Sequence, residues 1–145
     1  MLFNRNINVE RVLSTYCVRS AFDLYLQARK FEKGSEIVFT AMNIPDMTRI
    51  ATENGLKIVP LEINPSTFNI ISFEAFEKVI TPKTKAVVFA HLFGVHIDLD
   101  PYAGYLRKRG IDVIEDCAQG FWGADVFNGN PQSTITMFSF GFIKI

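Results

Sequence analysis

The sequence is poor in cysteine, has no excess of charge of either sign, and lacks a long apolar run. Its two cysteines, Cys17 and Cys117, show no CxxC or zinc-binding spacing, and two thiols make no disulfide framework. We expect both to be reduced core residues of an intracellular protein. The 15 basic and 15 acidic residues cancel, which gives no indication of a nucleic-acid partner or an anionic membrane surface.

Segments that direct a chain to or through a membrane are not visible either. The longest apolar runs, such as AVVFAHLFGV, are too short to cross a bilayer as a helix. The N-terminal stretch MLFNRNINVERVL has neither the unbroken apolar stretch nor the small-residue cleavage site of a signal peptide. We therefore expect a soluble, cytoplasmic protein without nucleic-acid or membrane partners.

Short motifs for phosphate-cradling loops and metal sites are missing as well. The sequence contains neither GxGxxG nor GxxxxGK[ST], and no HExxH. His91 and His96 lie in different local settings without carboxylates at ligand spacing, so we expect no metal site. His91 ends an apolar run. It could line a pocket, but we favour a hydrogen-bonded structural role for it.

Helix-like and strand-like segments alternate along the chain. The helical segments end at glycines or begin at residues such as Ser72, which is suited to capping a helix. The strand-like segments are apolar throughout, except that Pro60 favours an edge position or a bulge. The expected helices are 20–33, 44–55, 72–80 and 101–110, and the expected strands are 36–41, 57–63, 86–94, 111–119 and 135–140.

Strands that are apolar on both faces need helices on both sides of their sheet. The alternation therefore predicts an α/β domain of three layers, α/β/α, with a mainly parallel, doubly wound sheet. With 145 residues, the chain is long enough for one such domain. Many functions share this architecture, so function has to be argued from particular residues.

Ligands of open parallel sheets bind outside the carboxyl ends of the strands, which directs attention to residues 90–94, 115–119 and 139–144. Asp116 follows a buried strand and suits either a loop anchor or a carboxylate aimed at a cationic nitrogen of a ligand. Lys144 suits either a surface lysine or a desolvated amine that forms a Schiff base. An Asp at one strand end and a Lys at the next are the pair that pyridoxal phosphate requires.

Several segments in fixed order resemble the DegT/DnrJ/StrS family of pyridoxal-phosphate-dependent aminotransferases, which act on keto-sugars attached to nucleotides. ITPKTKAVVFAHLFG is similar to the family's ITPKTKAIIPVHLYG, and GIDVIEDCAQGFWGA to GLPVIEDAAQALGA. MFSFGFIK matches the family's FSFxxxK, and the likeness begins near Arg19. The resemblance implies the large-domain fold of the aspartate aminotransferase-like, fold type I transferases.

Carried over by position, four residues take family roles. Asp116 would face the pyridinium nitrogen, Gln119 the ring hydroxyl, and Ser139 the phosphate. Lys144 would be the Schiff-base lysine and the proton shuttle of transamination. The resemblance therefore implies pyridoxal 5'-phosphate as the cofactor.

Two positions depart from the family pattern. The family usually has a small Ser/Gly-Thr loop before the first helix of the large domain, whereas this chain has CVRSA, in which Arg19 or Ser20 would contact the phosphate. Ile44 stands where the family commonly places an aromatic residue that stacks on the cofactor ring.

The resemblance also bears on organisation and partners. Family members continue beyond the lysine through another strand and a small C-terminal domain, so we expect residues 1–145 to be the N-terminal part of the large domain. It implies a homodimer and small-molecule substrates, namely an amino acid donor and a keto-sugar acceptor in polysaccharide or secondary-metabolite biosynthesis. The alternatives are an inactive truncated remnant, half of a split protein that needs a complementing chain, or a sugar-nucleotide-binding protein without chemistry.

Overall fold

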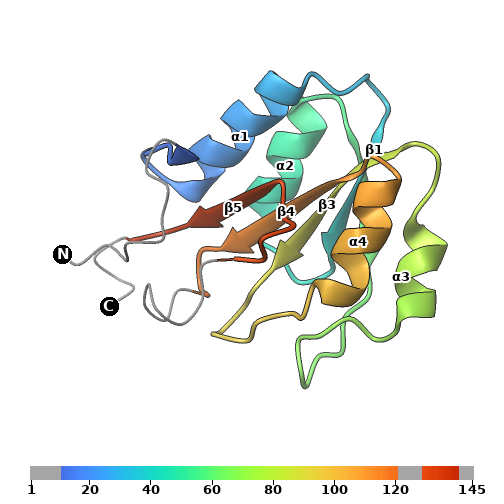
Figure 1. Ribbon diagram of the computed structural model, residues 1–145. Coiled ribbons are helices and arrows are strands. Elements are labelled where there is room, and N and C mark those ends of the chain that lie inside the picture. Colours follow the sequence, from blue (N-terminus) through green and yellow to red (C-terminus); the bar gives the residue numbers. More distant parts are fainter. Residues whose placement is uncertain (1–10, 121–128, 141–145) are drawn as a thin grey trace.

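The computed structural model describes residues 11–120 and 129–140, in which helices and strands alternate as expected (Figure 1). The helices expected from the sequence all form, and so do the strands. The helices are α1 (Val18–Arg29), α2 (Pro45–Glu53), α3 (Phe73–Val79) and α4 (Asp100–Lys108), and the strands are β1 (Glu36–Thr40), β2 (Lys57–Leu61), β3 (Thr84–Ala90), β4 (Asp112–Cys117) and β5 (Ile135–Phe138).

The strands form one sheet in the order β2-β1-β3-β4-β5, and every neighbouring pair is parallel. The prediction of a parallel sheet is confirmed. Pro60 lies in β2, at the edge of the sheet, where a residue without an N–H costs no ladder bond on the open side. The sequence-based expectation of an edge position is therefore confirmed too.

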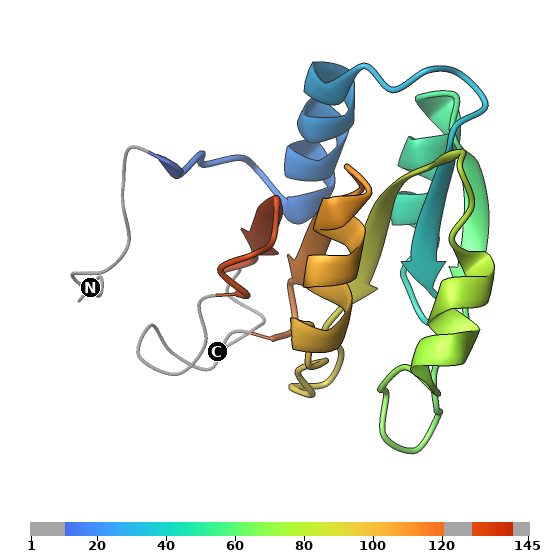
Figure 2. The ribbon, with the colours of Figure 1, turned by 45° about the vertical axis from the view of Figure 1, so that its right-hand side comes forward.

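Helices cover both faces of the sheet, with α1 and α2 on one side and α3 and α4 on the other (Figure 2). Phe22 of α1 meets Phe39 of β1 edge to face, at 6.1 Å between ring centroids. On the other face Phe76 of α3 stacks on Phe89 of β3, at 6.5 Å between ring centroids. The three-layer architecture is therefore held by two separate apolar layers.

The first helix ends earlier than its sequence pattern predicted. The expected stop was at Lys33-Gly34, but α1 ends at Arg29, and Lys30 adopts a left-handed backbone with φ 50°. The N–H of Lys30 donates to the carbonyl of Leu26, which closes the last turn. A lysine thus occupies a position that glycine usually takes.

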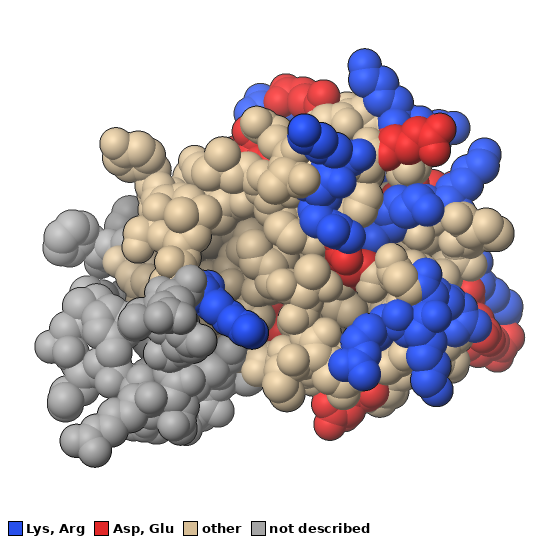
Figure 3. Space-filling view, turned by 45° about the horizontal axis from the view of Figure 1, so that its top comes forward, with Lys and Arg blue, Asp and Glu red and all other residues tan. Residues whose placement is uncertain are grey.

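None of the helices in the described ranges has the length and apolar character needed to cross a membrane. Figure 3 shows acidic and basic side chains together toward the right of the view, whereas the surface beside the grey residues carries few charges.

Candidate active site

Side chains of β4 alternate between the two faces of the sheet. Ile114 belongs to the apolar layer under α1 and α2, and Val113 to the layer under α3 and α4. By the period of two, Asp116 points to the α1 side and Glu115 to the opposite side. The two neighbouring carboxylates at this strand end therefore have different surroundings.

A cavity of about 240 Å³ lies on the α1 side at the carboxyl ends of the strands. It brings together three residues predicted from the sequence, Asp116, Ser139 and Ile44, which come from β4, the end of β5 and the start of α2. The other lining residues belong to the start of α1 and to the turn after β4: Cys17, Val18, Arg19 and Ala118.

The charges around this cavity are of both signs. Asp116 is 7% exposed, and its Oδ1 accepts a hydrogen bond of 3.0 Å from the backbone N–H of Ala118. The N-terminus of α1, where Arg19 lies, carries the positive end of the helix dipole. Arg19 Nε lies 3.6 Å from the Asp46 carboxylate. The cavity thus offers a carboxylate for a cation and positive groups for an anion.

The first turn of α1 differs from the sequence-based expectation. Cys17 is the N-cap residue and lines the cavity half-buried, so its assignment to the core was wrong, whereas Cys117 is buried as expected. The Sγ of Cys17 lies 3.4 Å from the Ser20 hydroxyl, and this hydrogen bond lowers the pKa of the Cys17 thiol. Arg19, and not Ser20, is among the residues that line the cavity.

Gln119 and Lys144 are not brought into the described lining. Gln119 is exposed, and its Oε1 accepts a hydrogen bond of 3.2 Å from the backbone N–H of Phe93. Phe93 has a left-handed backbone with φ 51°. Lys144 lies outside the described residues, so its predicted role stays a prediction.

On the other face of β4, Glu115 pairs with His91. His91 Nε2 lies 2.9 Å from Glu115 Oε2, and neither side chain is exposed. Burial alone would raise the pKa of Glu115, but hydrogen bonds from the His91 ring and the Asn130 backbone outweigh it, and the pKa is lowered. The expectation that His91 is a hydrogen-bonded structural residue is confirmed.

Cys117 lies beside this pair, and the ligand atoms of His91, Glu115 and Cys117 are within 4.8 Å of one another. Such a set can in principle hold a metal ion. However, the backbone N–H of Ile97 already donates to His91 Nδ1 at 3.0 Å, and Nε2 faces Glu115. Burial also raises the pKa of the Cys117 thiol, which disfavours the thiolate that a metal needs. The arrangement is that of a hydrogen-bonded pair.

The sequence pointed to Asp116 and gave no role to its neighbour Glu115. The period of two along a buried strand was the available signal, since it assigns neighbours to opposite faces.

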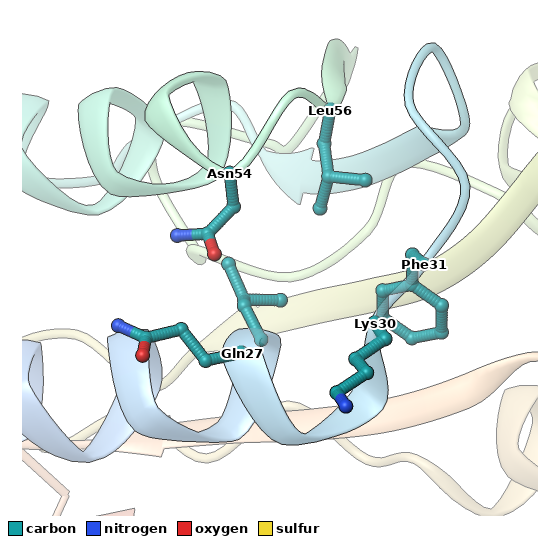
Figure 4. A pocket seen from close by; sticks show the side chains of 6 residues that line it. Gln27, Lys30, Phe31, Asn54 and Leu56 are labelled. Carbon is teal, nitrogen blue, oxygen red and sulfur yellow. The ribbon is translucent and has the colours of Figure 1, made fainter.

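A second cavity, also of about 240 Å³, lies at the other end of α1 (Figure 4). Its lining includes Lys30, the C-cap residue of α1, and Asn54, the C-cap residue of α2. Because both helices precede strands of the sheet, their C-terminal ends lie at the amino edge, away from Asp116. Among the described residues that line this cavity there is no carboxylate. It therefore lacks the group that a cationic ring would need.

Comparison with known proteins bears on the cavity at the carboxyl edge. The model of the DegT/DnrJ/EryC1/StrS aminotransferase family matches residues 2–145. The chain belongs to this family. The predicted resemblance is confirmed.

Individual proteins are similar to this chain over shorter stretches. The chain is 35% identical over 99 residues to the pleiotropic regulatory protein of Geobacillus stearothermophilus, which covers 68% of the chain and 26% of that protein. It is 34% identical over 105 residues to the GDP-perosamine synthase of Caulobacter vibrioides, and this match covers 69% of the chain and 27% of that protein. The chain thus spans about a quarter of the length of these relatives.

A solved structure supports the fold independently. NtdA from Bacillus subtilis, whose structure contains the bound cofactor PMP, superposes with a TM-score of 0.71 at 28% identity. The match covers 83% of this chain and 27% of NtdA. The parallel sheet with its flanking helices is therefore a fold that this chain shares with NtdA.

The residues of the carboxyl-edge cavity fit the cofactor of a family aminotransferase. A buried carboxylate, Asp116, suits a protonated ring nitrogen, and the Ser139 hydroxyl with the first turn of α1 suits a phosphate. Ile44, which is 42% exposed, offers an aliphatic surface to a planar ring. Donor, acceptor and apolar groups are thus present in one cavity.

Proposed function

We propose that this chain is the cofactor-binding part of a pyridoxal-phosphate-dependent aminotransferase that transfers an amino group from an amino acid to a keto-sugar. The observation that carries the proposal is the cavity in which Asp116, Ser139 and Ile44 meet from separate segments of the chain. The family and the names of its members, such as GDP-perosamine synthase, support a sugar substrate. We propose that the sugar is linked to a nucleotide.

When bound, pyridoxal phosphate supplies an aldehyde for the amino group and a ring that withdraws electrons. In the proposed site, Asp116 keeps a proton on the ring nitrogen, because a buried carboxylate stabilises a neighbouring cation. Ser139, Arg19 and the first N–H groups of α1 hold the phosphate, and Ile44 packs against the ring.

Two further residues complete the proposed site. Because a backbone N–H occupies Oε1 of Gln119, this side chain has its amide N–H groups left to offer to a ring hydroxyl. Lys144 is proposed to bind the aldehyde and to move the proton between the two carbons that exchange the amino group.

We also propose that the protein is a cytoplasmic homodimer, with this chain as the N-terminal part of its large domain. Support for the dimer comes from large apolar side chains exposed at the carboxyl edge of the sheet: Tyr16 precedes α1, Met42 follows β1, and Phe93 follows β3. Apolar side chains gathered at one edge are typical of an interface.

Titration of the full-length protein with pyridoxal phosphate tests the proposal. The wild-type protein is expected to develop a near-visible absorption band, and Lys144→Ala is expected to lose it. Lys78→Ala is the matched control, because Lys78 is an exposed lysine of α3 that pairs with Glu74. Failure of the wild type to bind the cofactor, or the same spectrum for Lys144→Ala as for Lys78→Ala, would contradict the proposal.

A further inference from the structure

The buried pair of His91 and Glu115 lies directly behind the proposed site. Both side chains have no exposed surface, and their polar atoms are 2.9 Å apart. Replacing a buried polar or ionic pair by apolar side chains of similar volume is often neutral or stabilising. Stability alone therefore does not account for such a pair.

His91 joins β3 and its following loop to the end of β4. Its backbone N–H donates to the carbonyl of Asp116 at 3.0 Å, and its Nδ1 accepts from the backbone N–H of Ile97 at 3.0 Å. Since a backbone N–H can only donate, Nδ1 is the unprotonated nitrogen. The ring therefore presents its Nε2–H to Glu115.

Glu115 joins β4 to the segment that leads into β5. Its Oε1 accepts from the backbone N–H of Asn130 at 2.7 Å and from the Thr136 hydroxyl at 3.1 Å. Thr136 is also the residue that pairs with Glu115 in the parallel ladder. The strand held in this way ends next to Ser139, which lines the cavity.

The backbone near Asn130 is shaped for this contact. Gly129 has φ +87°, and a Cβ at this position would lie 2.5 Å from Thr136 Oγ1. Only a glycine allows the chain to pass so close to Thr136 and still place the Asn130 N–H on Glu115.

We propose that His91 and Glu115 are positioning residues of the cofactor site. The pair fixes the end of β4 between β3 and β5, so that the Asp116 side chain points into the cavity beside Ser139. The positions of the two strand ends follow from the contacts above, while their purpose in cofactor binding rests on the proposed function.

Glu115→Gln is the variant that tests the pair with the least change of shape. Glu115 has acceptor oxygens toward donors on both sides, the His91 Nε2–H and the Asn130 N–H. A glutamine has only one oxygen, so one of these donors would meet an N–H₂ group. Thr136→Val is a milder variant, because it removes only one hydrogen bond to Glu115. It takes the place of Glu115→Gln if that variant does not fold.

The matched control is Asp112→Asn, at the amino end of the same strand. Asp112 accepts hydrogen bonds from Arg29 and Tyr25 on the α1 side, and its side chain is 10% exposed. This variant breaks another polar cluster of β4 without touching the carboxyl end. Asp112→Asn therefore distinguishes a general loss of stability from a displacement of the Asp116 side chain.

Hydrogen exchange of the Ala118 amide is the first measurement, because this N–H is bonded to Asp116 Oδ1 and needs no cofactor. At matched distance from the unfolding midpoint, Glu115→Gln is expected to speed this exchange about tenfold or more, and Asp112→Asn to leave it unchanged. Equal acceleration in the two variants would overturn the positioning role.

The affinity for pyridoxal phosphate is the second measurement. Glu115→Gln or Thr136→Val is expected to raise the Kd about tenfold, and Asp112→Asn to retain the wild-type Kd. Equal Kd values in all variants would also overturn the role. A wild type that does not bind pyridoxal phosphate contradicts the proposed function instead, and the exchange of the Ala118 amide then decides on the positioning role by itself.

Discussion

Three carboxylates on β4 differ in what surrounds them, although they lie within one short strand. Asp112 faces Arg29, Glu115 faces His91, and Asp116 lines the cavity. Asp112 and Asp116 point to the same helix, α1, at its two ends. The effect of burial differs at each position, because a nearby cation or hydrogen-bond donor favours the charged form of a carboxylate while burial disfavours it.

The lowered pKa of Glu115 has a consequence for stability at acidic pH. The Glu115 carboxylate stabilises the folded state fully at pH values above its usual pKa of 4.5, where it is ionised in both the folded and the unfolded chain. Below that pH the unfolded chain takes up the proton first, so this contribution is lost as the pH falls through the lowered pKa. The difference in unfolding free energy between wild type and Glu115→Gln should therefore be constant above about pH 5 and shrink below it.

Urea denaturation at a series of pH values measures this difference. Asp46→Asn is a suitable comparison, because Asp46 is 44% exposed and its ion pairs with Arg19 and Arg49 lie at the surface. If the difference in unfolding free energy between wild type and Glu115→Gln stayed constant down to the lowest accessible pH, the lowered pKa of Glu115 would be contradicted.

At the scale of helices and strands, local chemistry explains most of the boundaries. Ser72 was expected to cap α3, and its Oγ accepts a hydrogen bond of 3.1 Å from the Ala75 N–H. Pro60 was expected at an edge, and β2 is an edge strand. Both are properties of a few neighbouring residues, which is why sequence reasoning found them.

The long-range parts of the site could not be predicted in the same way. The contact of Cys17 with the cavity depends on how α1 packs against β5, which is distant in the chain. No local pattern records that packing. The same holds for the hydrogen bond between Phe93 and Gln119. Arg19 was found only through the resemblance to the family, which offered Arg19 or Ser20 as the phosphate contact.

The Ser72 cap gives a direct prediction for α3. Ser72→Ala should lower the free energy of unfolding by about 1 kcal/mol, because the Ala75 N–H loses its acceptor. Ser72→Asp should retain wild-type stability, since a carboxylate also caps and favours a helix N-terminus. Thermal unfolding followed by circular dichroism compares the three proteins, and equal losses in both variants would contradict the capping role.

Lys30 gives a prediction of the opposite sign for α1. Its left-handed backbone, φ 50°, is unfavourable for a residue with a Cβ, so Lys30→Gly should raise the unfolding free energy by up to about 1 kcal/mol. Lys30→Ala keeps the Cβ and serves as the control, with no gain expected. A denaturation midpoint for Lys30→Gly at or below that of Lys30→Ala would be inconsistent with this conformation.

For the molecule as a whole, the sheet links its two apolar layers. Neighbouring residues of β1 belong to different layers, Phe39 to that of α1 and α2, and Val38 to that of α3 and α4. A change in one layer is therefore transmitted to the other through the same strands. This arrangement predicts cooperative unfolding of both layers together.

Phe22→Ala and Phe76→Ala test this coupling, one in each layer. Both rings are fully buried, so each variant should lose about 3–5 kcal/mol, a large share of the stability of a domain of this size. Because the layers share their strands, each variant should shift one common denaturation transition and leave its slope unchanged. Hydrogen exchange in α1 and α2, compared with that in α3 and α4, identifies the affected layer. If Phe22→Ala accelerated exchange only in α1 and α2, and the amides of α3 and α4 kept wild-type protection up to global unfolding, the two layers would unfold independently. The prediction of cooperative unfolding would then be wrong.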